Sequence, residues 1–119
     1  MKIIYLDKNK VLARVCEKLV PTEAQFYHYS SIDDVEHFLE DIAPDLLFVD
    51  FSTLEEGQKD AFISFLANLK AQNGQMKIIG TGDLDTIEQE EKFSTLLSDK
   101  LAKPIAPDDF TQIFDKYRS

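Results

Sequence analysis

The chain has 119 residues, of which 44% are hydrophobic, so it is long enough and apolar enough to form one domain with a buried core. Its 22 acidic and 13 basic residues give a net charge of −9, which argues against nucleic acid as a partner because phosphate contacts require clustered lysine and arginine. No apolar stretch approaches the length of a membrane span, and a single cysteine excludes an internal disulfide. We therefore expect one cytoplasmic domain over residues 1–119 that does not insert into a membrane.

The first half of the chain alternates between strand-like and helix-like patterns. Apolar residues at 3–6 predict a buried strand, and an apolar stripe at helical spacing predicts a helix over 9–19. The aromatic run at 26–29 predicts a second strand. A capping-box pattern then opens a helix over 31–42, which a proline ends. The apolar run at 46–49 predicts a third strand that is buried on both faces.

The second half of the chain continues the alternation. A helix with an apolar face at 62–69 ends at an Asn-Gly pair, and a strand follows at 76–80. Residues 86–98 carry a weaker apolar stripe and predict a fourth helix with an acidic outer side. A fifth strand is expected at 99–102, and a proline starts the last helix over 107–117. Five strands alternating with five helices predict an α/β fold, a three-layer sandwich around a five-stranded parallel sheet.

Polar side chains close four of the five predicted strands. In chain order they are Asp7, Asp50, Thr81 and Lys103, the last of which precedes Pro104. Parallel strands end at the same edge of a sheet, where open α/β folds place their binding sites. We therefore expect two acids, a hydroxyl and an amine to converge there. The two histidines, His28 and His37, have no partners at metal-ligand spacing and are expected to be structural.

These four positions, separated by 43, 31 and 22 residues, resemble the receiver domain of two-component response regulators. The resemblance covers the whole chain and leaves no residues for an output domain. It implies the flavodoxin-like (βα)5 fold and a cis peptide bond between Lys103 and Pro104. It further implies a stand-alone response regulator that is a phosphoacceptor rather than an enzyme.

The resemblance also implies a role for each site residue. Asp50 would accept a phosphoryl group from a sensor histidine kinase or a phosphotransfer protein, with Lys103 and Thr81 contacting the phosphoryl oxygens. Asp7, Asp50 and the backbone carbonyl of Ser52 would hold Mg²⁺. Phosphorylation would then change the affinity for a downstream protein target, and a second copy of the chain is a further candidate partner.

Three positions depart from the receiver pattern. Lys8 stands where the family has a second acid, and exchanging a carboxylate for an ammonium disfavours Mg²⁺. The same ammonium is also able to neutralise phosphate directly, if its flexible side chain reaches the site. Lys100 replaces the aromatic residue that usually couples to the threonine. The loop at 51–57 lacks the usual Met-Pro pair and is about one residue short.

These departures leave other functions open. The second possible function is that of a degenerate pseudo-receiver, which binds partners without phosphorylation. Lys8 and Lys100 favour it, whereas the retained Asp50, Thr81 and Lys103 favour the phosphoacceptor. A remote third is a small phosphohydrolase resembling the haloacid dehalogenase family. The short chain disfavours that family, as does Asn9 at the place of its second acid.

Overall fold

The computed structural model describes residues 1–83, 85 and 93–118. Its strands form a five-stranded parallel sheet in the order β2-β1-β3-β4-β5. The strands are β1 (Lys2–Leu6), β2 (Gln25–Tyr29), β3 (Leu46–Asp50), β4 (Lys77–Asp83) and β5 (Asp99–Lys103). The predicted α/β fold with a five-stranded parallel sheet is confirmed, and each predicted strand is present within a few residues of its expected bounds.

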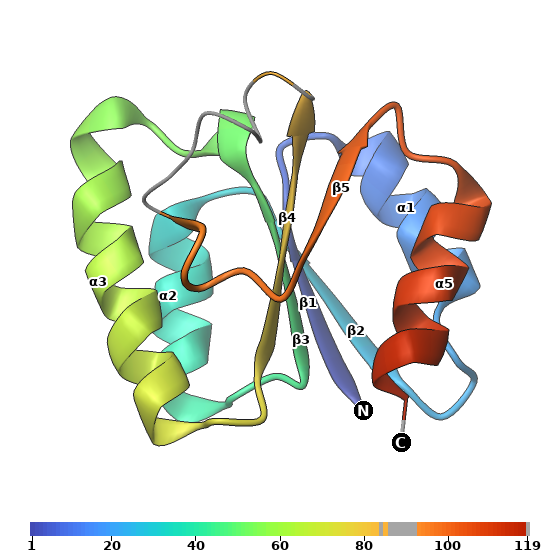
Figure 1. Ribbon diagram of the computed structural model, residues 1–119, viewed down its shortest axis with the longest axis horizontal. Helices are drawn as coiled ribbons and strands as arrows, with labels where there is room; N and C mark the ends of the chain where they lie inside the picture. The colour runs from blue at the N-terminus through green and yellow to red at the C-terminus, as the bar shows by residue number, and fades with distance from the viewer. Residues whose placement is uncertain (84, 86–92, 119) are drawn as a thin grey trace.

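The described helices cover both faces of the sheet (Figure 1). Two pack on one face, α2 (Ile32–Asp41) and α3 (Glu56–Gln72), and two on the other, α1 (Lys10–Leu19) and α5 (Pro107–Tyr117). A short 3-10 helix, η1 (Phe51–Thr53), follows β3 directly. Side chains cap the starts of α1 and α2, because Asn9 accepts a hydrogen bond from the N–H of Leu12 and Ser31 accepts one from that of Asp34. The predicted start of the second helix is therefore confirmed.

The fourth predicted helix is wrong in its C-terminal part. Residues 86–92 of that prediction lie outside the described residues. Beyond them the chain makes a single turn, in which the N–H groups of Leu96 and Leu97 donate to the carbonyl of Phe93. The N–H of Ser98 then donates to the carbonyl of Ile78 in β4 at 2.8 Å. The backbone has thus joined the sheet at Ser98, which excludes an α-helix there.

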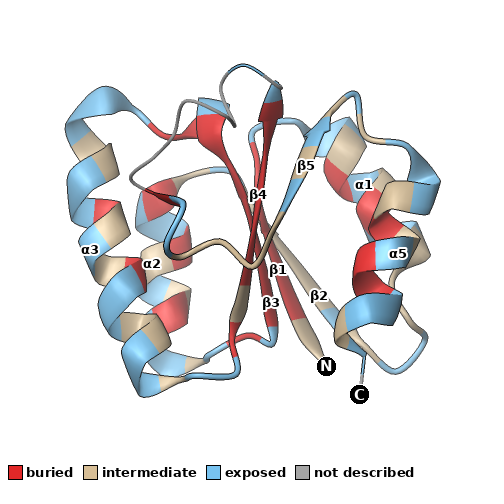
Figure 2. Cartoon of the chain, viewed as in Figure 1, coloured by how far each residue is buried: buried red, intermediate tan, exposed pale blue. Residues whose placement is uncertain are grey.

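The core has one layer on each side of the central strands, which are buried along almost their whole length (Figure 2). Alternate residues of β1 and β3 face opposite layers, as a pleated strand requires. Ile4, Leu6, Leu47 and Val49 pack toward α2 and α3. Ile3, Tyr5, Leu46 and Phe48 pack toward α1 and α5. The sheet is therefore fixed from both faces, so its carboxyl edge is a rigid platform.

The strand register aligns the ends of β1 and β3 with Thr81 at that edge, and β4 and β5 continue two residues further. Leu6 pairs with Val49, Asp50 pairs with Thr81, and Asp83 pairs with Lys103. Asp50 therefore lies level with Thr81, whereas Lys103 lies two residues further along β5, because Thr81 pairs with Leu101.

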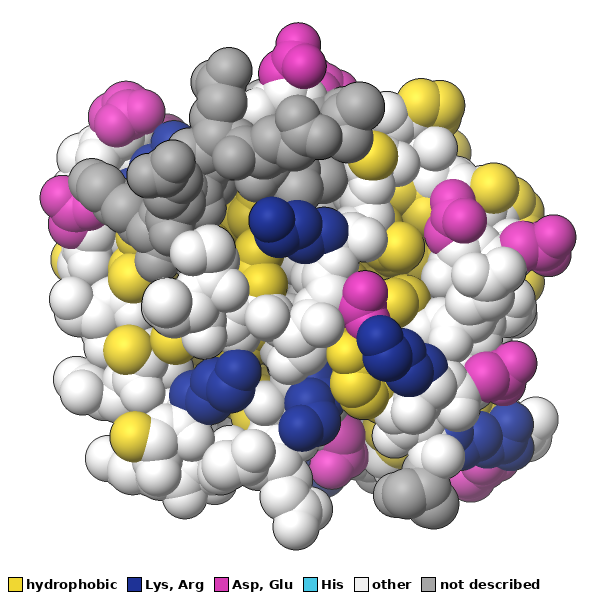
Figure 3. Space-filling view, in the orientation of Figure 1, with side chains coloured by type: hydrophobic (Ala, Val, Ile, Leu, Met, Phe, Trp, Pro, Cys, Tyr) yellow, Lys and Arg dark blue, Asp and Glu magenta, His cyan; other side chains and the backbone are white. Residues whose placement is uncertain are grey.

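On the face shown in Figure 3, the basic side chains of the described residues lie apart from one another instead of merging into one patch. No helix among the described residues is both long and apolar enough to cross a bilayer.

A prediction follows from the close approach of η1 to β4. A Cβ atom built at Gly80 would lie 2.7 Å from Cζ of Phe51, whose ring is buried, and 3.0 Å from Cδ1 of Leu97. We expect Gly80→Ala to lower the free energy of unfolding by about 1–3 kcal/mol in urea denaturation, because the buried ring must move. Gly57→Ala is the control, since no atom lies within 4 Å of its added Cβ and alanine favours the helix. Equal losses in the two variants would contradict this packing.

Candidate functional site

The four strand-end residues predicted from the sequence lie together at the carboxyl edge of the sheet. Asp7 directly follows β1, and its N–H donates to the carbonyl of Tyr29 at 3.1 Å. Asp50 and Lys103 are the last residues of β3 and β5. Thr81 lies within β4, because that strand extends three residues further than the sequence predicted, to Asp83. The convergence expected from the strand ends is present in the structure.

Lys103 bridges the two carboxylates. Its Nζ lies 2.9 Å from Oδ1 of Asp50 and 3.1 Å from Oδ2 of Asp7. The acidic side chains are 1% and 2% exposed, whereas that of Lys103 is 21% exposed. Two buried carboxylates at one place repel each other unless a cation lies between them. The ammonium of Lys103 supplies that cation, and the Lys103–Pro104 peptide bond is cis, as the resemblance implied.

The surroundings of Lys103 favour its charged form. Burial acts to lower the pKa of Lys103, but the hydrogen bond and attraction from Asp50, and then those from Asp7, outweigh it and raise the pKa above 10.5. Because the folded-state pKa is raised, this contribution to stability is complete below the ordinary lysine pKa. It is lost as the pH rises through the folded-state value, so it is present throughout the neutral range.

The carboxylate of Asp50 is fully hydrogen-bonded by the chain. Its Oδ1 accepts from Lys103 and, at 3.3 Å, from the hydroxyl of Thr81. Its Oδ2 accepts from the hydroxyls of Ser52 and Thr53, the latter at 3.0 Å. Each oxygen thus has two donors, so its charge is stabilised without water. Any reaction at Asp50 requires at least one of these donors to move.

Asp7 is held as firmly as Asp50. Its Oδ1 accepts from the backbone N–H of Asn9 at 2.8 Å, and its Oδ2 accepts from the hydroxyl of Tyr5 at 3.3 Å as well as from Lys103. Burial, followed by the charge of Asp7, raises the pKa of Tyr5, so the phenol stays protonated and donates. The Nε2 of His28 lies 2.7 Å from the backbone oxygen of Asp7. This contact agrees with the structural role expected for His28.

Three hydroxyl groups that orient the site were not predicted from the sequence. They belong to Tyr5, Ser52 and Thr53. Tyr5 lies in β1 and Asp7 follows that strand directly, two residues on, so strand alternation continued by one residue places both side chains on one side and was a usable signal. Thr53 and the Ser52 hydroxyl reach Asp50 only because η1 turns the chain back over the strand end. Nothing in the composition of that loop predicts this turn.

Lys8 lies at the rim of the site and is tied to it through its backbone. Its N–H donates to Oγ1 of Thr53 at 3.1 Å, and that oxygen in turn donates to Asp50. The side chain of Lys8 is exposed and makes no ion pair with a described residue. The backbone of Lys8 is therefore two hydrogen bonds from Asp50, and its exposed ammonium is carried on a flexible side chain that starts beside the site.

The donor set of the site does not fit Mg²⁺ as it stands. Magnesium requires several oxygen ligands in octahedral geometry, yet the described residues bring together no three His, Cys, Asp or Glu side chains that could hold a metal. Lys103 contacts both Asp7 and Asp50, and the chain's own donors occupy all four of their oxygens. A magnesium ion would have to displace that ammonium while a second one, on Lys8, stays nearby.

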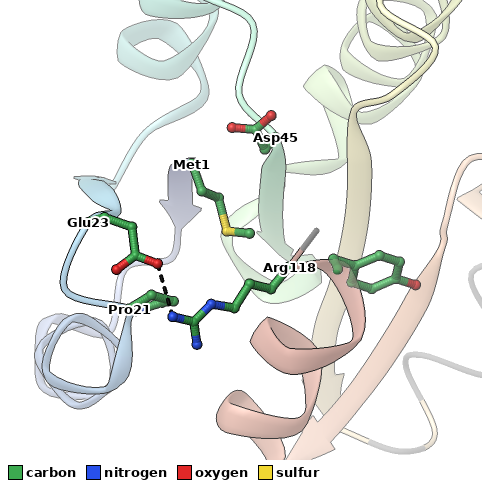
Figure 4. A pocket seen from close by; sticks show the side chains of 6 residues that line it. Met1, Pro21, Glu23, Asp45 and Arg118 are labelled. Atoms are coloured by element: carbon green, nitrogen blue, oxygen red, sulfur yellow. Dashed lines mark hydrogen bonds and ion pairs between the residues drawn. The ribbon is translucent and has the colours of Figure 1, made fainter.

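A separate hollow lies at the opposite edge of the sheet and is not a competing site. It has a volume of about 230 Å³ and is lined by Met1, Pro21, Glu23, Asp45, Tyr117 and Arg118 (Figure 4). Its guanidinium is paired, because Nη2 of Arg118 lies 3.0 Å from Oε1 of Glu23. Asp45 accepts from the N–H of Lys2 at 2.7 Å. The charged groups of this hollow therefore already have partners.

The bridge made by Thr53 generates a stability prediction. Thr53→Val removes the hydroxyl that joins Asp50 to the N–H of Lys8, which should lower the free energy of unfolding by about 1–3 kcal/mol in urea denaturation. Ser52→Ala is the matched control, because it removes a hydroxyl from the same oxygen of Asp50. Ser52 is exposed, so water replaces that hydroxyl and the loss should be smaller. A larger loss of stability in Ser52→Ala than in Thr53→Val would show that Thr53 does not brace the site.

Comparisons with known proteins rest on the fold. No family model matches the sequence, and no curated protein matches it. The chemotaxis response regulator CheY4 of Vibrio cholerae is similar with a TM-score of 0.77 and 11% identity, over 98% of this chain and 97% of that one. A receiver domain of a two-component response regulator from Bacteroides fragilis has a TM-score of 0.74 and 17% identity, over 99% and 96% of the two chains.

The receiver domain of the Francisella response regulator 1452 is also similar, with a TM-score of 0.72 and 20% identity over 98% of this chain and 94% of that one. The similarity covers nearly the full length of each of these three structures. The chain therefore has the fold of CheY-like receiver domains.

Proposed function

We propose that this chain is a receiver module of two-component signalling in which Asp50 accepts a phosphoryl group. The observation that carries the proposal is the pair of donors on one oxygen. The ammonium of Lys103 and the hydroxyl of Thr81 both contact Oδ1 of Asp50, at 2.9 and 3.3 Å. A cation and a hydroxyl on one carboxylate oxygen are the groups that stabilise the negative charge on a transferring phosphoryl group.

The reaction is a direct exchange of one bond for another. A lone pair of an Asp50 carboxylate oxygen forms a bond to phosphorus, while the bond from phosphorus to the donor's histidine nitrogen breaks and its electron pair returns to the imidazole. Lys103 and Thr81 hold the phosphoryl oxygens and Asp7 keeps Lys103 in position. The product is an acyl phosphate, which carries more negative charge than the carboxylate it replaces.

The change of contacts at Asp50 provides the signal. Ser52 and Thr53 hold η1 through Oδ2 of Asp50, so a phosphoryl group in their place releases or re-aims that turn. The aromatic relay of other receivers is replaced by Lys100, which is exposed. The partners we propose are a sensor histidine kinase or phosphotransfer protein upstream, and a protein target whose affinity follows the state of η1.

A second candidate is an interaction module that binds its partner without phosphorylation. It is favoured by the burial of Asp50, whose side chain is 1% exposed and whose oxygens all have donors. A phosphodonor must open this arrangement before it can react. Lys8 favours the same candidate, because it stands in place of an acid and so disfavours a metal that would assist phosphorylation.

A phosphohydrolase is disfavoured because Asp109, which would stand in the last motif of the haloacid dehalogenase order, already has a structural role. The carboxylate of Asp109 accepts from the N–H of Ala106 at 2.9 Å and so caps the first turn of α5. We therefore propose a signalling role rather than turnover of a substrate.

The proposal is tested by intact-mass spectrometry after incubation with acetyl phosphate. The wild type should gain the mass of one phosphoryl group, and Asp50→Asn should gain none. The matched control is Asp45→Asn, which changes an exposed acid at the opposite edge of the sheet and should leave the gain intact. No gain in the wild type under any condition would reject the phosphoacceptor and leave the interaction module.

A further inference from the structure

We infer that phosphoryl transfer to Asp50 proceeds without a divalent cation, because the ammonium of Lys8 supplies the positive charge that a metal would bring. This inference rests on the proposed function, since it concerns the same phosphoryl group. It assigns Lys8 a direct contact with the phosphoryl oxygens. It follows from the charge balance, the hydrogen-bonded oxygens and the position of Lys8.

The charge balance shows what the site lacks. Asp7 and Asp50 share a single cation, Lys103, so the three side chains together carry one excess negative charge. Acyl phosphate formation adds further negative charge at the same place. In a buried site this charge needs a partner. One more cation is therefore required, either from solution or from the chain.

The oxygens of the site leave little room for a cation from solution. Magnesium needs open oxygen ligands, whereas each oxygen of Asp7 and Asp50 accepts at least one hydrogen bond from the chain. Lys103 already fills the space between the carboxylates. A divalent ion entering there would meet that ammonium at short range, and also the ammonium of Lys8 at the rim.

Lys8 has the position and freedom to be that cation. Its N–H is bonded to Oγ1 of Thr53 at 3.1 Å, and Thr53 is bonded to Asp50 at 3.0 Å, so its backbone stays beside the acceptor. Its side chain is exposed and has no ion pair with a described residue. Lysine is a compact charge on a flexible stem of four carbons, able to follow a phosphoryl group as it forms.

The step needs no further reactant when acetyl phosphate is the donor. An Asp50 oxygen forms the bond to phosphorus, and the bond between phosphorus and the acetyl oxygen breaks. Acetate leaves with the electron pair, and no proton is transferred. Lys8 and Lys103 neutralise the phosphoryl oxygens throughout.

The test compares phosphorylation rates with Mg²⁺ and with EDTA, by intact-mass spectrometry with acetyl phosphate. The wild type should react at the same rate within about twofold in both. Lys8→Ala should react about tenfold or more slowly in both, because the charge is lost. Lys8→Asp should be slow in EDTA and accelerated by Mg²⁺, because it adds a carboxylate ligand. Lys10→Ala, another exposed lysine two residues away, is the matched control and should match the wild type.

A second readout does not depend on the reaction. Mn²⁺ broadens amide resonances close to it in NMR spectra, and it binds the same oxygen ligands as Mg²⁺. The amides of Asp7 and Asp50 should stay sharp in the wild type and broaden in Lys8→Asp. Selective broadening of these amides in the wild type would overturn the inference.

The outcomes separate this inference from the proposed function. A wild type that reacts only with Mg²⁺ would overturn the role of Lys8 while leaving Asp50 as the phosphoacceptor. A Lys8→Ala protein that reacts in EDTA as fast as the wild type would also overturn it. A wild type that is modified in neither condition would reject the proposed function, and this inference with it.

Discussion

A single ammonium group between two buried carboxylates is the contact on which the arrangement of this site depends. Nζ of Lys103 lies 2.9 Å from Asp50 and 3.1 Å from Asp7, and both acids are almost fully removed from solvent. Burying two like charges side by side is unfavourable, and removing one partner of a buried ion pair costs about 3–5 kcal/mol. The three charges are stable only together. The strands that carry them must therefore keep a fixed register, in which Lys103 lies two residues beyond the level of Asp50.

The sheet order explains why the residue at the end of β5 is a lysine. β4 lies between β5 and β3, so the side chain of Lys103 has to cross one strand to reach Asp50 and another to approach Asp7. Neighbouring strands are about 4.8 Å apart, and only a long side chain covers that distance. The β4 residues on either side of Thr81 are both glycines, Gly80 and Gly82. Gly82 also has a φ of 155°, which L residues rarely adopt. The length of the lysine side chain thus lets β5 contribute a cation to carboxylates at the ends of β3 and β1.

The sequence predicted the residues that lie on strands and missed those that depend on a turn. Asp7, Asp50, Thr81 and Lys103 were identifiable because apolar runs locate strand ends and parallel strands end at one edge. The hydrogen bond from Thr53 to Asp50 was not identifiable from the sequence, because the Thr53 hydroxyl reaches Asp50 only through the fold of η1. The helix predicted over 86–98 extended too far for a related reason. Its apolar spacing continues to Leu97, whereas the backbone of Ser98 pairs with Ile78 in the sheet. Local periodicity does not contain such a tertiary hydrogen bond.

The bridge that Lys103 makes between Asp7 and Asp50 is tested most directly by an NMR titration of the lysine side chains. The resonances of the groups next to Nζ are followed from neutral to strongly alkaline pH. The surroundings described above raise the pKa of Lys103 above 10.5, so its resonances should shift at higher pH than that value. In Asp50→Asn the midpoint should fall, because the carboxylate charge that favours the ammonium is removed. A Lys103 midpoint at or below the ordinary lysine value, unchanged by Asp50→Asn, would show that Lys103 does not bridge the two carboxylates. The site would then have to be explained without that contact.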